Sequence, residues 1–432
     1  MSQAAAKAVE TAAQSDAAAD QAPPVLSDAG KVEVLTVQRS HGDLPLAMLM
    51  RQVAANYGKS FNQLLGEFVK LGYGPGKLSV EEYFDLRLFD DKALAGADKR
   101  EFIGMSVMRT VWDQINYDRN WFGLLNDKLA STALLGAYGF PVIPVEAIFS
   151  TEVDLPRPQC RVLRSADDLR AFMREPGNYP MFGKPTDGLQ SLGSMSFDGL
   201  DAATGILTMV DGSKVALDQV VADVATHYQA GYLLQKRLIP HAAIRAICGQ
   251  RLATVRIVTI NPKSGPEIIR AAWKIPAGAN AADNFWRSGN LLGTVDIETG
   301  RIVRVIRGKG IDQEPVACHP DSGTRMVDFE LPMWAEAKAL ALAGMKVFKS
   351  MGMIGWDIAI TDQGPVIVEP NESPDHVLPQ LADRRGIMDE RFRAFVAERK
   401  SEFAAVLQHA RKTLREESRK NVQRVSASIG KV

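Results

Sequence analysis

The stretch that most constrains the fold is residues 355–374, which read Gly-Trp-Asp-Ile-Ala-Ile-Thr-Asp-Gln-Gly-Pro-Val-Ile-Val-Glu-Pro-Asn-Glu-Ser-Pro. β-branched residues on both sides of Asp362-Gln363-Gly364 predict a β-hairpin with a three-residue loop, whose glycine adopts the left-handed conformation. This register sets Asp357 opposite Glu369 on one face of the hairpin. Asn371 projects from the same face, because side chains alternate along a strand.

The other face of this hairpin is predicted to be apolar. The same register pairs Ile358 with Val368 and Ile360 with Val366, which gives a surface that can pack into a core. The chain has 432 residues, of which 46% are hydrophobic, so it can bury a large core and form two or three subdomains.

The opposed carboxylates of Asp357 and Glu369 suggest a metal site. Like charges directly across a strand pair destabilise a sheet, and a divalent cation removes that conflict. Two carboxylates with the Asn371 amide nearby suit Mg²⁺ or Mn²⁺, which proteins usually hold together with substrate phosphates. The alternative is an exposed hairpin with solvated acids.

The sequence Gly-Trp-Asp-Ile-Ala-Ile-Thr, then Gly-Pro, then Glu-x-Asn resembles the metal-binding end of the ATP-grasp superfamily. It is most similar to the sugar-transfer-associated ATP-grasp group, also called α-L-glutamate ligase-related. A weaker similarity covers residues 126–380. The resemblance implies an α+β ATP-grasp fold, in which two α+β subdomains clasp ATP with Mg²⁺, or with Mn²⁺, held by Asp357, Glu369 and Asn371.

The chain divides into five predicted regions. They are a disordered leader (1–28), a helical N-terminal region (29–122), a small nucleotide-binding subdomain (123–240), a large metal-binding and catalytic subdomain (241–385), and a C-terminal amphipathic helix with a basic tail (386–432).

Within the small subdomain, the resemblance implies that Lys128, at the start of a predicted helix, contacts a phosphate. A helix-surface salt bridge is the alternative for Lys128. Lys184 ends a predicted strand and would contact the α- and β-phosphates. Residues 186–193, which include Ser191, would form the lid over those phosphates; an ordinary hairpin loop is the alternative.

The predicted strand from Tyr232 would carry the adenine site. The resemblance implies that the backbone from Gln235 to Leu238 hydrogen-bonds adenine, although many relatives have Glu where this chain has Lys236. His241 would approach the ribose, or be structural.

Basic residues on the next two predicted strands, and in the polar loop that holds Arg287, would serve catalysis. Arg256 interrupts a β-branched strand and needs a partner; the resemblance puts it near the γ-phosphate, and an ion pair with Asp357 and Glu369 is the structural alternative. The remaining catalytic candidates would hold the acceptor or acyl phosphate, or be surface residues: Arg270, Lys274 and Arg287.

Composition limits the partners and the compartment. Lys plus Arg and Asp plus Glu both number 51, which gives no electrostatic reason to expect nucleic acid or an anionic membrane. Cys160, Cys248 and Cys318 lack metal-binding spacing and suit a reducing compartment. With no signal-peptide pattern and no long apolar run, a cytoplasmic protein is expected.

The function predicted from these residues and the resemblance is ATP-dependent carboxylate–amine ligation through an acyl phosphate, with release of ADP and phosphate. The substrates would be a small carboxylate and a small amine. An ATP-dependent phosphotransferase on a hydroxyl group and a non-catalytic nucleotide sensor are the alternatives.

Overall fold

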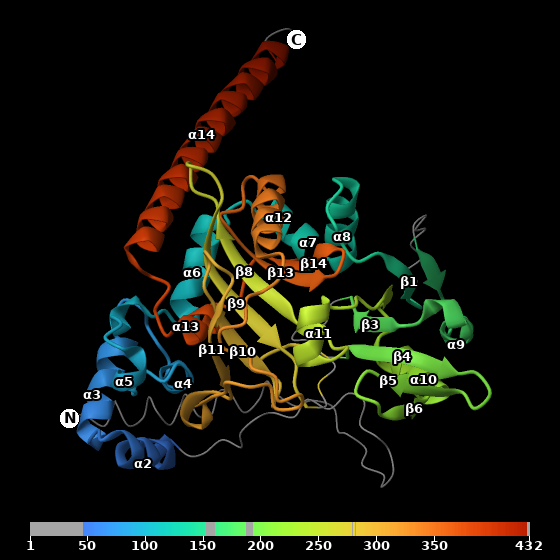
Figure 1. Cartoon of the computed structure of the whole chain (residues 1–432). Coiled ribbons are helices and arrows are strands. Elements are labelled where there is room, and N and C mark those ends of the chain that lie inside the picture. The colour runs from blue at the N-terminus through green and yellow to red at the C-terminus, as the bar shows by residue number, and fades with distance from the viewer. Residues whose placement is uncertain (1–45, 153–159, 187–192, 279, 281, 430–432) are drawn as a thin grey trace. The chain divides into compact units, whose positions relative to one another are not determined.

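The computed structural model describes residues 46–152, 160–186, 193–278, 280 and 282–429, with side chains described as far as residue 421 (Figure 1). All of them belong to one of the chain's two units, which runs from Val37 to Val432. The predicted leader at residues 1–28 lies outside the described residues, as do Ser191 and most of the predicted lid.

The N-terminal part of the described chain is helical, as predicted. Ser60 and Ser79 each form a capping box with the residue three positions later, which satisfies the first free N–H groups of two helices. The helices of this part are α2 (Leu46–Tyr57), α3 (Phe61–Gly72), α4 (Val80–Asp85), α5 (Asp91–Leu94), η2 (Lys99–Glu101), α6 (Met105–Ile115), α7 (Asn120–Asn126) and α8 (Lys128–Ala137).

The first of two seven-stranded sheets has the strand order β2-β1-β7-β3-β4-β5-β6. Its pairings are antiparallel except for the parallel pair β1–β2. The elements here are β1 (Val145–Phe149), β2 (Arg161–Leu163), α9 (Ala166–Arg174), η3 (Pro176–Asn178), β3 (Met181–Pro185), β4 (Met195–Asp201), β5 (Ile206–Met209), β6 (Lys214–Ala216), α10 (Leu217–His227) and β7 (Tyr232–Lys236).

The second sheet is entirely antiparallel, in the order β12-β11-β10-β9-β8-β13-β14. Its elements are α11 (Ala242–Cys248), β8 (Thr254–Ile260), β9 (Glu267–Ile275), β10 (Leu291–Val295), β11 (Ile302–Arg307), η4 (Gly310–Asp312), β12 (Glu314–Pro315), α12 (Trp334–Val347), β13 (Met353–Thr361) and β14 (Gly364–Asn371).

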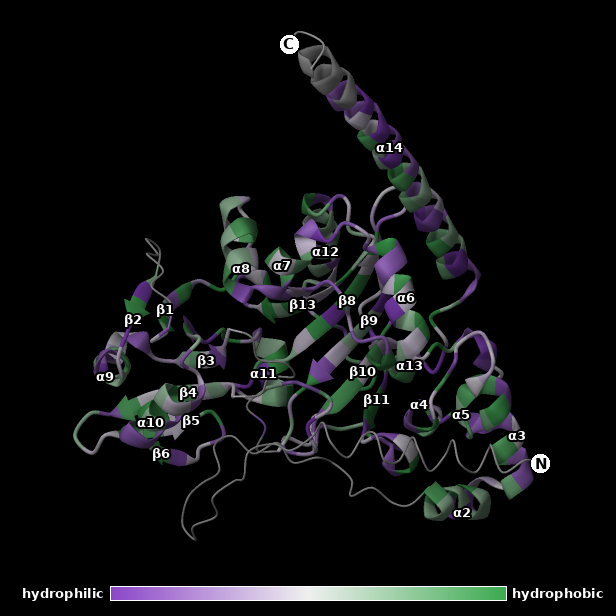
Figure 2. Ribbon diagram, turned by 180° about the vertical axis from the view of Figure 1, so that it is seen from behind, coloured by the Kyte–Doolittle hydropathy of each residue, from purple (hydrophilic) through white to green (hydrophobic). Residues whose placement is uncertain are grey.

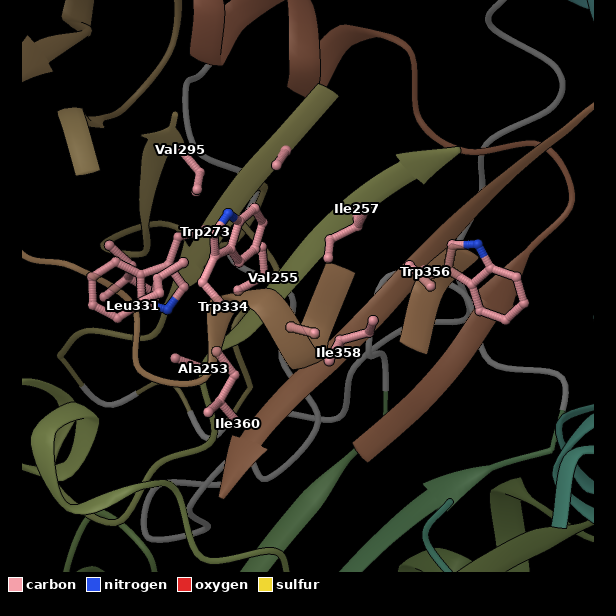
Figure 3. Close-up of a cluster of buried hydrophobic side chains, with 14 of the residues drawn as sticks. Ala253, Val255, Ile257, Trp273, Val295, Leu331, Trp334, Trp356, Ile358 and Ile360 are labelled. Carbon is pink, nitrogen blue, oxygen red and sulfur yellow. The ribbon is translucent and has the colours of Figure 1, made fainter. Parts of the chain in front are cut away.

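The central strands of the second sheet separate an apolar face from a charged one. Strand side chains alternate, so Val255 and Ile257 enter the main hydrophobic cluster while Arg256 between them points to the other side (Figure 3). The same alternation sets Trp273 against Lys274 and Trp356 against Asp357. The apolar face packs on α12, and the opposite face carries buried charges.

The structure confirms the hairpin and the Asp357–Glu369 pair, but it differs in the loop. Thr361 pairs with Gly364, so the loop has two residues, Asp362 and Gln363, instead of the predicted three. A bulge between the Asp357 and Ile358 pairs then adds one residue to β14 and restores the predicted register at Glu369.

The predicted apolar pairs of the hairpin are therefore wrong. Ile358 lies opposite Ile367, and Ile360 lies opposite Pro365. Val368, at the bulge, lines a cavity on the charged side instead of entering the core.

Two helices complete the described chain. α13 (Val377–Asp383) packs on β9, β10 and β11, and α14 (Glu390–Ile429) begins with Phe392, Phe395 and Val396 buried near α6. From residue 404 to residue 421 the side chains of α14 are exposed, and hydrophilic residues recur along it in Figure 2. No described helix is long and apolar enough to cross a membrane.

Candidate active site

A cavity of about 950 Å³ lies on the charged side of the second sheet. Its walls come from β3, β4 and β7 of the first sheet and from β8, β9, β13 and β14 of the second. Cavities of this size commonly hold small molecules and cofactors. The cavity therefore joins residues that the sequence assigned to separate subdomains.

Four charged side chains form a row across the strands at the floor of this cavity. Lys274 on β9, Arg256 on β8, Asp357 on β13 and Glu369 on β14 all line it. Strand pairing sets Arg256 directly opposite Asp357, and Asp357 directly opposite Glu369. Asn371, two residues beyond Glu369, lines the same cavity and donates from Nδ2 to the Gly355 carbonyl at 3.3 Å.

Asp357 is the anionic centre of the row and is only 2% exposed. Arg256 donates to it through Nε at 2.6 Å and through Nη2 at 3.0 Å, and Lys274 donates through Nζ at 2.9 Å. Burial opposes ionisation of this carboxyl, but the two cations outweigh burial and hold the pKa of Asp357 well below its usual range. Arg256 thus forms the ion pair with Asp357 that is the predicted alternative to a γ-phosphate contact.

Asp283 extends this network from the loop between β9 and β10. It accepts from the Thr254 backbone N–H at 2.7 Å and from the Thr254 hydroxyl, and it lies 3.5 Å from Lys274 Nζ. Burial raises the pKa of Asp283 despite these partners, and the nearby Asp357 charge adds to the effect. Lys274 consequently bridges two buried carboxylates.

Lys184 lines the cavity from β3 and is 8% exposed. Burial lowers the pKa of its ammonium group, while the carboxylates of Glu369 and Asp357 act in the opposite direction. No side chain among the described residues forms an ion pair or hydrogen bond with Lys184. Lys128 lines the cavity as well, and its Nζ donates to the Thr186 carbonyl at 3.2 Å.

The end of β7 contributes polar groups to another wall. Gln235, Lys236 and Leu238, which are assigned from the sequence to an adenine site, line the cavity. Gln235 donates from Nε2 to the Ile143 carbonyl at 3.2 Å, but its Oε1 is buried without a hydrogen-bond partner among the described residues. The Ser196 hydroxyl, on β4, also lines the cavity wall and is buried with no hydrogen-bond partner among the described residues.

A sequence model of one protein family, described as sugar-transfer associated ATP-grasp, matches residues 108–394. The chain belongs to this ATP-grasp family. Its mixed fold of two sheets and surrounding helices is the ATP-grasp fold. None of the curated proteins matches this chain.

Several solved structures are similar to this ATP-grasp chain. D-alanine–D-alanine ligase from Bacillus anthracis, complexed with ATP, is 14% identical over 65% of this chain and 68% of its own, with a TM-score of 0.35. The corresponding Coxiella burnetii ligase is 11% identical over 67% and 62%, with a TM-score of 0.38. L-amino acid ligase from Bacillus licheniformis is 11% identical over 62% and 45%, with a TM-score of 0.31.

Some residues predicted for the site do not reach the cavity. Arg270 shares the strand face of Lys274 but is covered by the α13 region, where it pairs with Asp383 at 3.2 Å and Asp389 at 3.3 Å. Arg287 is half-buried outside the cavity lining, and burial lowers the pKa of its guanidinium.

His241 also lies away from the cavity. It caps α11, with Nδ1 accepting from the Ala243 N–H at 3.1 Å, and its Nε2 lies 3.9 Å from Asp362. This geometry supports the structural alternative for His241.

The structure adds cavity residues that the sequence did not suggest. Asp283 lies four residues before Arg287, but a single Asp in a polar loop carries no pattern that points to a site. Ser196 lies on β4, three residues after the predicted lid, and Arg237 lies within the Gln235–Leu238 stretch, whose backbone alone was predicted to contact adenine. Asp85 belongs to a helix far upstream, and nothing in its local sequence points to a site.

Proposed function

We propose that this ATP-grasp chain is an ATP-dependent carboxylate–amine ligase that works through an acyl phosphate. The observation that carries the proposal is the convergence of Lys184, Arg256 and Lys274 with Glu369 and Asn371 on one cavity. This set provides fixed positive charge beside oxygen ligands, which is what phosphoryl transfer needs from a protein.

The cation at Lys184 supports binding of a polyphosphate. A buried ammonium group is unfavourable unless it is paired, and Lys184 has no ion-pair partner among the described side chains. Lys128 lines the same cavity and adds a second positive charge. A triphosphate between these lysines would supply the missing counter-charge.

Orphaned polar atoms support a nucleoside on the β7 side. Gln235 Oε1 and the Ser196 hydroxyl are buried and lack partners in the described chain, and buried polar groups normally have them. A purine with its donors and acceptors would satisfy such groups. The residues of this wall therefore fit ATP.

Glu369 and Asn371 fit a magnesium ion bound mainly through phosphate oxygens. The described residues contain no group of three or more His, Cys, Asp or Glu side chains able to hold a metal. Mg²⁺ is commonly held by one or two carboxylates plus substrate phosphates, so fewer than three protein ligands suffice. Glu369 would be the direct ligand, with Asn371 and the remaining acceptor capacity of Asp357 beside it. The metal would neutralise phosphate charge.

The reaction follows in two balanced steps. A carboxylate oxygen of the first substrate attacks the γ-phosphorus, and the bond to the β-phosphate oxygen breaks, giving an acyl phosphate and ADP. The nitrogen of the amine then attacks the acyl carbon, phosphate leaves, and the nitrogen loses a proton. Lys184, Arg256 and Lys274 would stabilise negative charge on the transferring phosphoryl group.

The test supplies the protein with ATP, Mg²⁺ and pooled carboxylic acids and amines, and identifies products by mass spectrometry. A condensation product with ADP and phosphate is expected. Glu369→Gln should reduce its formation by about 100-fold or more, the range for losing a charge-stabilising group. Glu372→Gln, an acid on the same segment that does not line the cavity, is the matched control and should stay active. A phosphorylated hydroxyl compound, or bound ATP that is never consumed, would overturn the proposal.

A further inference from the structure

Beside the cations proposed to face phosphate, the cavity has a second group of lining residues, called here its second end. This end is lined by Asp85 of α4, by Arg109 and Trp112 of α6, and by Trp286, Lys309 and Asp375. Asp85 precedes the segment matched by the family, which begins at residue 108. The N-terminal helices thus form part of the cavity wall.

Side-chain contacts join four of these residues into one group, namely Asp85, Lys309, Trp286 and Asp375. Lys309 Nζ donates to Asp85 at 3.1 Å and lies 5.9 Å from the ring centre of Trp286. Trp286 Nε1 donates to Asp375 Oδ2 at 2.7 Å. The other oxygen of Asp375 accepts from the Val377 N–H at 2.8 Å. Asp375 is therefore held in place and retains acceptor capacity on Oδ2.

The Trp112 indole and the Arg109 guanidinium at this end have donors available for further hydrogen bonds. Trp112 lines the cavity, and its indole Nε1 is buried with no partner in the described part of the chain. Arg109 lines the cavity from the same helix, and its guanidinium pairs with no described carboxylate. Buried donors are rarely left unpartnered, so the Trp112 N–H points to a ligand atom.

The two ends of the cavity differ in charge. The end proposed to face phosphate carries Lys128, Lys184, Arg256 and Lys274, of which Arg256 and Lys274 are paired with Asp357. Besides the Asp85–Lys309 pair, the second end presents Asp375 and Arg109, an anion and a cation that form no ion pair with each other, together with the indoles of Trp112 and Trp286. A group of this kind complements a molecule that carries both an amine and an anionic group.

We propose that this second end is the subsite for the amine substrate, and that the substrate is a small zwitterion of the amino-acid type. Asp375 holds its ammonium group, Arg109 pairs with its carboxylate, and the indoles of Trp112 and Trp286 contact its apolar part. The inference rests on the proposed function, because it names the class of the amine.

The experiment measures binding separately from turnover. Titration calorimetry is performed on the full chain with a panel of amino acids, their decarboxylated amines and their N-acetyl forms. The expected result is binding of amino acids, with the other two series weaker by at least about tenfold, because each lacks one charge-assisted contact. Asp375→Asn should weaken amino-acid binding by at least about tenfold, and Arg109→Met should remove the preference over decarboxylated amines.

Asp113→Asn is the matched control, because Asp113 lies on α6 with its side chain 61% exposed and does not line the cavity. Arg109→Lys should restore part of the preference. Arg109 is exposed, so its variants test the subsite even if Asp375→Asn fails to fold.

Failure of this inference and failure of the proposed function give different results. If ATP-dependent condensation occurs but neither variant changes amine binding or selectivity, the proposed subsite is refuted and the proposed ligase activity is supported. If amino acids bind through Asp375 and Arg109 but no condensation is found, the subsite stands and the ligase fails. If no amino acid binds the wild-type chain, the inference is overturned.

Discussion

Replacement of Asp357 by Asn isolates the electrostatic centre of the cavity. The wild-type carboxylate accepts three hydrogen bonds, from Arg256 at 2.6 and 3.0 Å and from Lys274 at 2.9 Å. In the variant the two cations remain buried, but their counter-charge is gone and an amide N–H₂ faces one of them. Removing one partner of a buried ion pair costs about 3 to 5 kcal/mol.

The expected shift in melting temperature follows from the size of the chain. Unfolding entropies of about 2.1 cal/mol/K per residue give about 0.9 kcal/mol per degree for 432 residues. Asp357→Asn should therefore melt about 3 to 6 °C below the wild type in scanning calorimetry without ATP or Mg²⁺.

Glu369→Gln is the matched comparison, because the two acids lie opposite each other on adjacent strands. Glu369 is half-buried and forms no ion pair or hydrogen bond with any described side chain. Its variant should melt within about 1 °C of the wild type. If Asp357→Asn has the same melting temperature as the wild type in the absence of ligands, then the burial of Arg256 and Lys274 does not depend on the carboxylate and the reasoning is refuted. Equal destabilisation by both variants would refute the contrast between them.

Other perturbations test neighbouring parts of the same network. Lys184→Met removes a buried, unpaired ammonium, so without ligand it should raise the free energy of unfolding by about 1 kcal/mol. It should also abolish the rise in melting temperature that ATP is expected to produce in the wild type, and a variant that ATP still stabilises would contradict this. Arg270→Met breaks the buried pair with Asp383 and a partly exposed pair with Asp389, so it should cost about 3 kcal/mol of stability and leave turnover per folded molecule within about twofold. A specific loss of turnover would instead favour the catalytic role that the sequence predicted. Because the pKa of Asp357 is lowered in the folded state, the stability that it provides is present above the unfolded pKa of about 4 and is lost as the pH falls through the folded value. The melting difference between wild type and Asp357→Asn should persist from pH 5 to 7 and narrow below about pH 4, and a difference that widens there would contradict the sign.

The sequence was sufficient for the hairpin acids because two departures from the expected geometry cancel. The loop is one residue shorter than predicted, and the bulge near Val368 adds one residue to β14. Both changes arise from local backbone geometry that residue patterns specify weakly. The Asp357–Glu369 pair survives, whereas the apolar pairs between the loop and the bulge shift by one.

Alternation along a strand predicts the face on which a side chain lies, but not what covers that face. Arg270 and Lys274 are in phase on β9, yet α13 and the residues after it cover Arg270 while Lys274 opens to the cavity. The covering helix comes about 100 residues later in the sequence. The same reasoning applies to Asp85, whose place in the cavity depends on how α4 packs against distant strands. Such long-range packing carries no local pattern.

The ion pairs around Asp357 also bear on how the cavity can remain folded before a nucleotide arrives. A row of cations able to bind phosphate would repel itself in a buried site without an internal anion. Asp357 supplies that anion for Arg256 and Lys274, and Asp283 shares Lys274 from the other side. Lys184 has no such partner among the described side chains, so an incoming polyphosphate gains most by approaching it. Asp357 thus balances the protein's own cations, and under the proposed function Glu369 is available for a positive charge that the ligand brings. This division explains why one buried and one half-buried carboxylate face each other across β13 and β14, and it requires the Asp357 and Glu369 variants to differ in stability while both impair turnover.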